Sequence, residues 1–188
     1  MADFDYVKPG GRVFAEASAR LKAFSDEAKA EKASATAIQW QWTKFSDLSA
    51  KQLYEMIALR EQVFVVEQEC VYLDCDGKDL KSWHLLGWHQ ISSDQEELVA
   101  YLRVLPPGLR FDELSIGRVV TSPNYRRQGF GRILMQEGIS RISETFGDVP
   151  VRIAAQAYLE RFYTELGFRK DSEEFLEDNI PHIEMIKP

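Results

Sequence analysis

The strongest constraint on the fold lies in the middle of the chain, where an apolar strand leads through a short glycine loop into an amphipathic helix. Residues 114–121 are mostly apolar or β-branched, and Ser122-Pro123-Asn124 ends the run. A helix is expected to begin near Gly129, because the following apolar residues recur at helical spacing. They are Leu134, Met135, Ile139, Ile142 and Phe146. This order predicts an α/β fold in which a helix N-terminus follows the end of a strand.

The rest of the chain indicates further strands and helices within one domain. Strands are expected at residues 38–42, 83–89, 98–104, 151–155 and 182–186, and helices at residues 50–66 and 158–166. Ser49 is the expected N-cap of the first of these helices, and Gly167 the expected stop of the second. The polar residues 92–97 predict a moderately long hairpin loop. We expect one domain over residues 38–188, and an Ala-rich tail or loosely docked helix over residues 1–37.

Composition excludes several classes of protein. The chain has 188 residues and a formal charge of −7, which argues against a general nucleic-acid binder or a protein of anionic membranes and suits a cationic substrate. No segment approaches the roughly 18 apolar residues of a membrane span, and the N-terminus does not resemble a secretion signal. Cys70 and Cys75 match neither a disulfide framework nor a zinc spacing. A cytoplasmic protein with two unreactive thiols is expected.

The loop before the helix has the features of an anion-binding site. The first N–H groups of a helix have no partner within the helix, and its dipole adds about half a positive charge there. Gly129 and Gly131 let the backbone approach an anion closely, and Arg126, Arg127 and Arg132 add positive charge. A nucleotide phosphate or pyrophosphate would suit such a loop.

Spacing separates this loop from two familiar nucleotide loops. A Walker A loop ends in Gly-Lys-Ser/Thr, whereas Gly131 is followed by Arg132 and Ile133. A dinucleotide loop needs a third small residue where this chain has Leu134. Both are disfavoured.

The spacing of Arg126, Gly129 and Gly131 resembles the acetyl-CoA loop of the GNAT N-acetyltransferase superfamily. Further along, Phe162-Tyr163-x-x-x-Gly167-Phe168 resembles the second motif of these enzymes. Other segments resemble the ElaA-like branch of the superfamily, so that the resemblance covers residues 40–186. These segments are Trp42 and residues 59–60, 63–68, 72–80, 84–88, 98–103, 116–119 and 180–183.

The resemblance implies the GNAT acyl-CoA N-acyltransferase fold, an α/β fold with a mixed, mostly antiparallel sheet of six to seven strands flanked by about four helices. It also implies acetyl-CoA as cosubstrate and direct transfer of the acetyl group to a primary amine of a small molecule or peptide. No metal is implied. The implied cofactor-binding residues are Val119, Val120, Thr121, Arg126, Arg127, Gln128, Gly129, Phe130, Gly131, Arg132, Gln156, Phe162 and Tyr163.

The catalytic groups follow in part from the resemblance. Tyr163 is the expected general acid for the leaving thiolate, and a backbone N–H near residues 119–120 is expected to bind the developing oxyanion. The general base stays open. Glu113 is the nearest carboxylate ahead of the third strand, and Ser115 stands where many relatives carry a glutamate and could order a water. Carboxylates from loops are the remaining candidates, namely Glu67, Glu69 and Asp76.

Several alternatives stay open. His182 is either a substrate-side residue, as the resemblance implies, or a structural one, while His84 and His89 fall on opposite faces of one strand and form no metal site. The protein could be a non-catalytic acyl-CoA-binding module. Segment 60–68 suggests an autoinducer-synthase-like enzyme with a longer acyl chain. A scaffold of two or more subunits, or a homodimer, is the remaining alternative.

Overall fold

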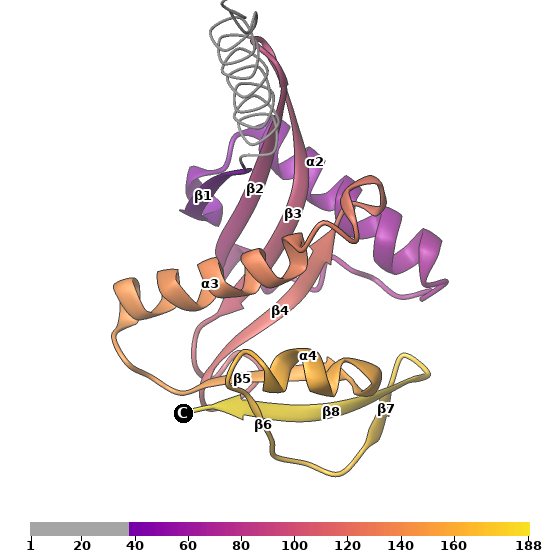
Figure 1. Cartoon of the computed structure of the whole chain (residues 1–188), viewed down its shortest axis with the longest axis vertical. Helices are drawn as coiled ribbons and strands as arrows, with labels where there is room; N and C mark the ends of the chain where they lie inside the picture. Colours follow the sequence, from indigo (N-terminus) through magenta and orange to yellow (C-terminus); the bar gives the residue numbers. More distant parts are fainter. Residues whose placement is uncertain (1–37) are drawn as a thin grey trace, which may run out of the picture. The chain divides into compact units, whose positions relative to one another are not determined.

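The fold is described by a computed structural model for residues 38–188 (Figure 1). The tail or docked helix expected over residues 1–37 lies outside the described residues. The described part forms one compact unit around an eight-stranded sheet. Its strands are β1 (Ile38–Lys44), β2 (Trp83–Ser92), β3 (Gln95–Leu105), β4 (Leu114–Thr121), β5 (Val151–Gln156), β6 (Arg169–Lys170), β7 (Phe175–Glu177) and β8 (Ile180–Lys187).

Three α-helices accompany the strands within residues 38–188. They are α2 (Ala50–Arg60), α3 (Phe130–Phe146) and α4 (Glu160–Thr164). A π-helical segment, η2 (Glu61–Glu67), extends α2. Short 3₁₀ turns are η1 (Phe45–Asp47), η3 (Asp79–Lys81), η4 (Pro123–Tyr125) and η5 (Ala157–Leu159). None of the helices in this part of the chain is long and apolar enough to cross a membrane.

The sheet contains one parallel junction. Its strand order is β1-β2-β3-β4-β5-β8-β6, and β7 also pairs with β8. All neighbours are antiparallel except β4 and β5, which pair only through Leu114 with Val151 and Ser115 with Arg152. Beyond these two pairs β4 and β5 separate, so that the sheet opens between them.

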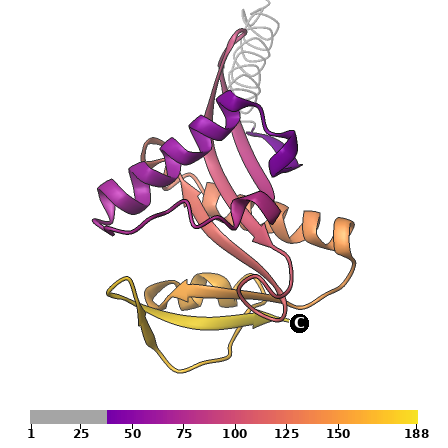
Figure 2. The ribbon, with the colours of Figure 1, turned by 180° about the vertical axis from the view of Figure 1, so that it is seen from behind.

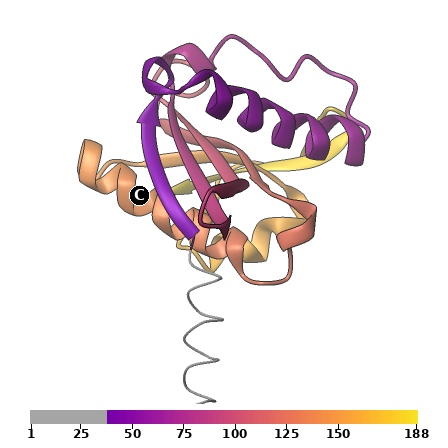
Figure 3. The same cartoon turned by 90° about the horizontal axis from the view of Figure 1, so that it is seen from above.

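Helices cover both faces of the sheet. Figure 3 shows α2 on one face, with α3 and α4 on the other. Alternation along β2 and β3 explains the two layers, because Leu85 and Ala100 join the core beneath α3 and α4, whereas their neighbours Leu86 and Tyr101 join the core beneath α2. In Figure 2, which shows the molecule from behind, α2 crosses in front of the central strands. Both cores lie beside β4, the strand that leads into the glycine loop.

Local chemistry sets the position of the two long helices. Ser49 is the N-cap of α2, as predicted: its hydroxyl accepts from the Gln52 N–H, and the Gln52 side chain accepts from the Ser49 N–H. On α3, Gly138 faces Leu102, and a Cβ there would lie 2.7 Å from a Leu102 methyl group. The missing side chain allows α3 to approach the sheet closely.

The structure corrects three details of the sequence prediction. The β2–β3 hairpin has a two-residue turn instead of a loop over residues 92–97, because its polar strand ends continue the pairing to Ser92 and Gln95. The sheet has eight strands instead of six to seven, since β6 and β7 are too short to show a period of two. The last helix is also shorter than expected, because η5 takes its first turn.

Candidate active site

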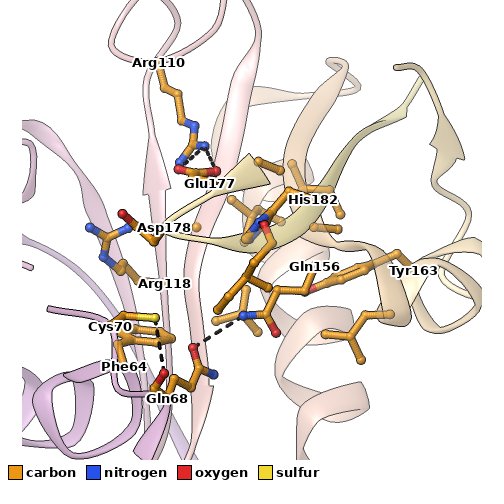
Figure 4. A pocket seen from close by; sticks show the side chains of 18 of the residues that line it. Phe64, Gln68, Cys70, Arg110, Arg118, Gln156, Tyr163, Glu177, Asp178 and His182 are labelled. Atoms are coloured by element: carbon orange, nitrogen blue, oxygen red, sulfur yellow. Dashed lines mark hydrogen bonds and ion pairs between the residues drawn. The ribbon is translucent and has the colours of Figure 1, made fainter. Parts of the chain in front are cut away.

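A pocket lies where β4 and β5 separate. One wall is formed by residues 116–119 of β4, and the other by residues 153–156 of β5. The opening between the strands therefore gives access to both backbones. Other lining residues come from the segment after α2, from the β3–β4 loop, from η5 and α4, and from the β7–β8 hairpin (Figure 4). They are Phe64, Gln68, Cys70, Tyr72, Arg110, Leu159, Tyr163, Glu177, Asp178, Ile180 and His182.

The β4 wall carries a β-bulge. Tyr101 pairs with Val120 and Arg103 with Gly117, so that one residue of β3 faces two residues of β4, Arg118 and Val119. Arg118 has a φ of 53°, a left-handed conformation that is unusual for a residue with a side chain. The bulge removes main-chain groups of Arg118 and Val119 from regular pairing at the pocket wall.

Buried ion pairs hold this wall and the loop beside it. Arg118 Nε lies 2.6 Å from Asp74 Oδ1, and Arg60 Nε lies 2.7 Å from Asp74 Oδ2. Arg103 bridges Asp76 and Asp79, with Nη1–Oδ1 distances of 2.8 and 2.9 Å. Burial alone would raise the pKa of Asp79, but hydrogen bonds from Arg60 and Arg103 outweigh it and keep the pKa below its ordinary value. This ion-pair network fixes loop 74–79 against β3 and β4.

The glycine loop is open in front of α3. Gly129 is the residue before the helix and has a φ of 83°, which a residue with a Cβ adopts only with strain. Within the described residues, the N–H groups of Gly129, Phe130 and Gly131 make no backbone hydrogen bond. A Cβ on Gly129 or Gly131 would meet no atom within 4 Å. These free donors and the open space fit an anionic group such as a pyrophosphate.

Two arginines connect this loop to elements that line the pocket. Arg126 donates two hydrogen bonds to Glu67, whose neighbour Gln68 lines the pocket. Arg132 donates to Glu165, and its guanidinium lies 5.6 Å above the ring of Phe162, next to Tyr163. The glycine loop is therefore linked to η2 and α4, two elements that also contribute residues to the pocket lining.

The other residues predicted to bind the cofactor are divided between the pocket lining, the core and the exposed loop. Val119 and Gln156 line the pocket, and Gln156 Nε2 donates weakly to Gln68 Oε1 at 3.4 Å. Val120 packs into the core beneath α2, so only its backbone is on the pocket side of the fold. Phe130 is buried. Thr121 is half-buried at the end of β4, and Arg127 and Gln128 are exposed in the loop.

Tyr163 reaches the pocket from α4. It is buried, it contacts Phe162 and Phe168 edge to face, and its hydroxyl makes no hydrogen bond within residues 38–188. Burial raises the pKa of Tyr163 to about 12, with a smaller contribution from Tyr158. The phenol therefore stays protonated at neutral pH and can donate a hydrogen bond into the pocket.

All five predicted base candidates lie outside the pocket lining. Glu113 accepts two hydrogen bonds from Arg152, at 2.8 and 3.0 Å, and these hydrogen bonds lower its pKa. Ser115 is fully buried, and its hydroxyl has no partner in the described part of the chain. Neither Glu113 nor Ser115 lines the pocket, so we base no step on them.

Sequence reasoning gave no role to several lining residues. Asp178 lines the pocket but stands in no motif that pointed to a function, and Arg118 lies in the resembling segment 116–119 but had no expected role. One signal for Asp178 was present, since Asp178-Asn179 is a dipeptide typical of tight hairpin turns. Among residues 38–188, no group of three side chains could hold a metal ion.

Comparison with known proteins agrees with this fold. The profile of the GNAT acetyltransferase domain matches residues 86–188. The chain is 43% identical to a UPF0039 protein of Synechocystis sp. over 79% of this chain and 94% of that protein. It is 41% identical to protein ElaA of Escherichia coli over 80% of this chain and 96% of ElaA. The chain belongs to the GNAT acyltransferase family, in its ElaA-like branch.

Solved structures support the same assignment. A Pseudomonas aeruginosa acyl-CoA N-acyltransferase superposes with a TM-score of 0.75 at 40% identity and covers 81% of this chain and 100% of its own. The structure of Escherichia coli ElaA superposes with a TM-score of 0.73 over the same shares of the two chains. Acyl-CoA is the cosubstrate class of this family.

Proposed function

We propose that this protein is an N-acetyltransferase that moves the acetyl group of acetyl-CoA directly to a primary amine. The observation that carries the proposal is the combination of free N–H groups at the start of α3 with a pocket between β4 and β5 that has Tyr163 in its lining. Arg126 and Arg132 link the two through Glu67 and Phe162. Acetyl-CoA would supply an acyl group activated as a thioester. The residues of this chain bind it, orient it and move protons.

Binding would begin at the glycine loop. The N–H groups of Gly129, Phe130 and Gly131 and the positive end of the α3 dipole are suited to the pyrophosphate. Arg126, Arg127 and Arg132 add cationic side chains around the same loop. The open space at Gly129 and Gly131 permits the close approach that such contacts require.

Chemistry would take place between the β4 bulge and α4. A main-chain N–H that the bulge removes from regular pairing is the donor that we assign to the acyl carbonyl oxygen. The Tyr163 hydroxyl, protonated and without another partner within the described residues, would donate a proton to the departing sulfur. Because Cys70 is buried and burial raises its pKa, a nucleophilic thiol role is not part of the proposal. The cytoplasmic location and a homodimer stay predictions from the sequence.

A thiol-release assay over a panel of amines tests the function. The purified protein is mixed with acetyl-CoA and, in turn, diamines, monoamines, glucosamine and a lysine peptide, and free CoA thiol and acetylated product are measured. Amine-dependent thiol release with a product heavier by one acetyl group is expected. Binding of acetyl-CoA without release would favour a non-catalytic acyl-CoA-binding module. Faster transfer from octanoyl-CoA than from acetyl-CoA would replace acetyl by a longer acyl chain.

A further inference from the structure

The β7–β8 hairpin places a carboxylate at the pocket. Its two turn residues, Asp178 and Asn179, have φ values of 50° and 62°, which is the backbone of a tight type I′ turn. Such a turn fixes the direction of both strands, so Asp178 is held at a defined place on the pocket wall. Figure 4 shows Asp178 and Tyr163 on different sides of the pocket.

Asp178 differs from the other charged groups in the lining. Glu177 accepts two hydrogen bonds from Arg110, at 2.8 and 2.7 Å, and Arg118 is held by Asp74. Asp178 has no ion pair within residues 38–188. It is therefore the pocket carboxylate that is available to a cationic group of a ligand.

His182 lies on the same hairpin and has a fixed tautomer. Its Nδ1 lies 2.8 Å from the carbonyl oxygen of Ile180. A carbonyl oxygen can only accept, so Nδ1 carries the hydrogen and donates it, which leaves a lone pair on Nε2 of the neutral ring. The ring also stacks on Phe175 with centroids 6.1 Å apart. His182 is thus oriented as a proton acceptor in the pocket lining.

Of the carboxylates that could compete for the role of base, Glu69 is exposed and lies outside the pocket lining, and the other three are held by arginines. Arg126 holds Glu67, Arg103 holds Asp76 and Arg152 holds Glu113, each through two hydrogen bonds from one guanidinium group. An arginine partner stabilises the charged form of a carboxylate and makes it a weaker base. No such cation contacts His182 in the described part of the chain.

Resting on the acetyl-transfer function above, we propose that the β7–β8 hairpin is the acceptor side of the pocket and selects a diamine or polyamine, with Asp178 holding one ammonium group and His182 Nε2 taking a proton from the other. The two amine groups of the ligand have to occupy separate positions in the pocket. A carboxylate beside the reacting nitrogen would stabilise its protonated form and oppose attack, so Asp178 is suited to a second cationic group.

The proton balance is complete. The reacting ammonium nitrogen gives one proton to His182 Nε2, and its lone pair then forms the C–N bond at the acyl carbon. The C–S bond breaks, and the electron pair leaves with sulfur, which receives the Tyr163 proton. The nitrogen then loses a second proton, which restores the Tyr163 hydroxyl. His182 releases the proton that it took from the ammonium group to solvent. The products are an N-acetyl amine, free CoA thiol and one proton.

Kinetics with matched amines test the selectivity. Diamines of three to six carbons are compared with monoamines of the same length, in wild type, Asp178→Asn and the control Glu173→Gln, an exposed acid outside the pocket lining. We expect a diamine to have a KM about tenfold below that of its monoamine, and Asp178→Asn to remove this difference with little change in kcat. Equal KM values in the wild type, or a preference that survives Asp178→Asn, would overturn the assignment of Asp178.

A second set of variants tests His182. His182→Gln should lower kcat by about 10²-fold or more, leave acetyl-CoA affinity unchanged by calorimetry, and leave the diamine KM within a small factor. Added imidazole should restore part of the rate to His182→Ala, which a purely structural role would not allow. His89→Gln, on β2 outside the pocket lining, is the matched control. A kcat for His182→Gln close to that of wild type would overturn the role of His182.

Nitrogen NMR of the three histidine rings separates failure of this inference from failure of the proposed function. The His182 ring, assigned with His182→Gln, should show a hydrogen on Nδ1, and diamines should shift its signals in wild type but not in Asp178→Asn. If no amine is acetylated yet these shifts occur, the proposed function fails and the acceptor side stands. A hydrogen on Nε2, or no shift with any diamine, overturns the inference whatever the activity.

Discussion

Arg126 and Glu67 form a two-point ion pair between the glycine loop and η2, with Nη1–Oε1 and Nη2–Oε2 distances of 2.5 and 2.8 Å. The hydrogen bonds from Arg126 lower the pKa of Glu67, so the pair stays charged at neutral pH. One of the cations assigned to the pyrophosphate is therefore already bound to a carboxylate when no ligand is present. An incoming anion has to compete with Glu67 for Arg126.

Glu67→Gln should strengthen binding of CoA. Both partners are substantially exposed, and an exposed pair contributes only about 0.2–1 kcal/mol, so the affinity should rise by a factor between about 1.4 and 5. Calorimetric titration with CoA at low and high salt measures it. Glu61→Gln, an exposed acid of the same segment without an ion pair in the described residues, is the control. Weaker binding by Glu67→Gln would show that Glu67 supports the ligand site.

Gly129→Glu should abolish CoA binding, whereas Gly147→Glu should not. Both glycines have positive φ, a Cβ at either position would meet no atom within 4 Å, and they flank opposite ends of α3. Gly129→Glu should lower the free energy of unfolding by about 1–2 kcal/mol, because Gly129 has a left-handed backbone. Gly147→Glu should cost at least as much, up to about 3 kcal/mol, because the φ of 79° and ψ of −166° at Gly147 lie in a region that is almost restricted to glycine. Only Gly129 lies beside the unpaired N–H groups at the start of α3, so only its substitution should block the anion. Calorimetry and urea unfolding separate the two effects, and equal loss of binding in both variants would contradict the placement of the anion.

Tyr163→Phe should lower kcat by about 10²-fold while acetyl-CoA affinity and stability stay near wild type. The hydroxyl makes no hydrogen bond in the described structure, so its removal leaves no buried partner unsatisfied. Since the pKa of Tyr163 is raised to about 12, its ionisation should not reduce the rate between pH 7 and about 10. The exposed Tyr158→Phe is the control. An unchanged kcat in Tyr163→Phe would remove Tyr163 from the mechanism.

The protein should lose stability as the pH falls below the pKa of an ordinary histidine. His84 is fully buried, its Nε2–H donates to the Asp79 carbonyl and its Nδ1 accepts from the Tyr101 hydroxyl. Burial lowers the pKa of His84 to about 4, so below about pH 6.5 the unfolded chain binds a proton that the folded chain excludes. Stability should therefore decrease from about pH 6.5 to about pH 4, by up to about 3 kcal/mol.

Urea unfolding of wild type and His84→Gln at pH 7.5 and pH 5 measures this loss. Glutamine can both donate and accept but does not titrate, so the variant should lose less stability than wild type over this interval. The other two histidines are present in both proteins, so their contributions cancel in the comparison. An identical loss in the two proteins would show that His84 is not the cause.

Arg60→Leu should destabilise the fold by about 3–5 kcal/mol, because Asp74 and Asp79 stay buried but lose their ion pairs with Arg60. Arg141→Leu, which removes exposed pairs on α3, should change stability by less than about 1 kcal/mol. The midpoint of urea unfolding for both variants tests this contrast. A small effect of Arg60→Leu would mean that the ion-pair network is not what fixes loop 74–79.

Elements with a local signal could be predicted from the sequence. The helix α3 has apolar residues at helical spacing, Ser49 has a glutamine three residues on for its capping box, and Gly129 marks a backbone that residues with a Cβ avoid. The glycine loop and the position of Tyr163 on α4 were expected for the same reason. Each of these features depends on residues that are close in sequence.

Features that depend on distant residues could not be predicted in this way. Glu113 looked like a free carboxylate near the strand, but the register of β5 brings Arg152 onto it. Asp178 and His182 face the pocket only because β7 pairs with β8, and the three residues of β7 are too few for a period of two to be recognised. Charged residues are expected at the surface, so the burial of Arg60 carried no signal in the sequence.

Calorimetric titration of the purified protein with acetyl-CoA, followed by thiol release with the amine panel in the same buffer, tests the central claim most directly. The proposed function predicts saturable binding that Gly129→Glu abolishes and Tyr163→Phe retains, and CoA release by the wild type that requires an amine. Absence of acetyl-CoA binding by the wild type, or binding that Gly129→Glu leaves intact, would contradict the account of this site.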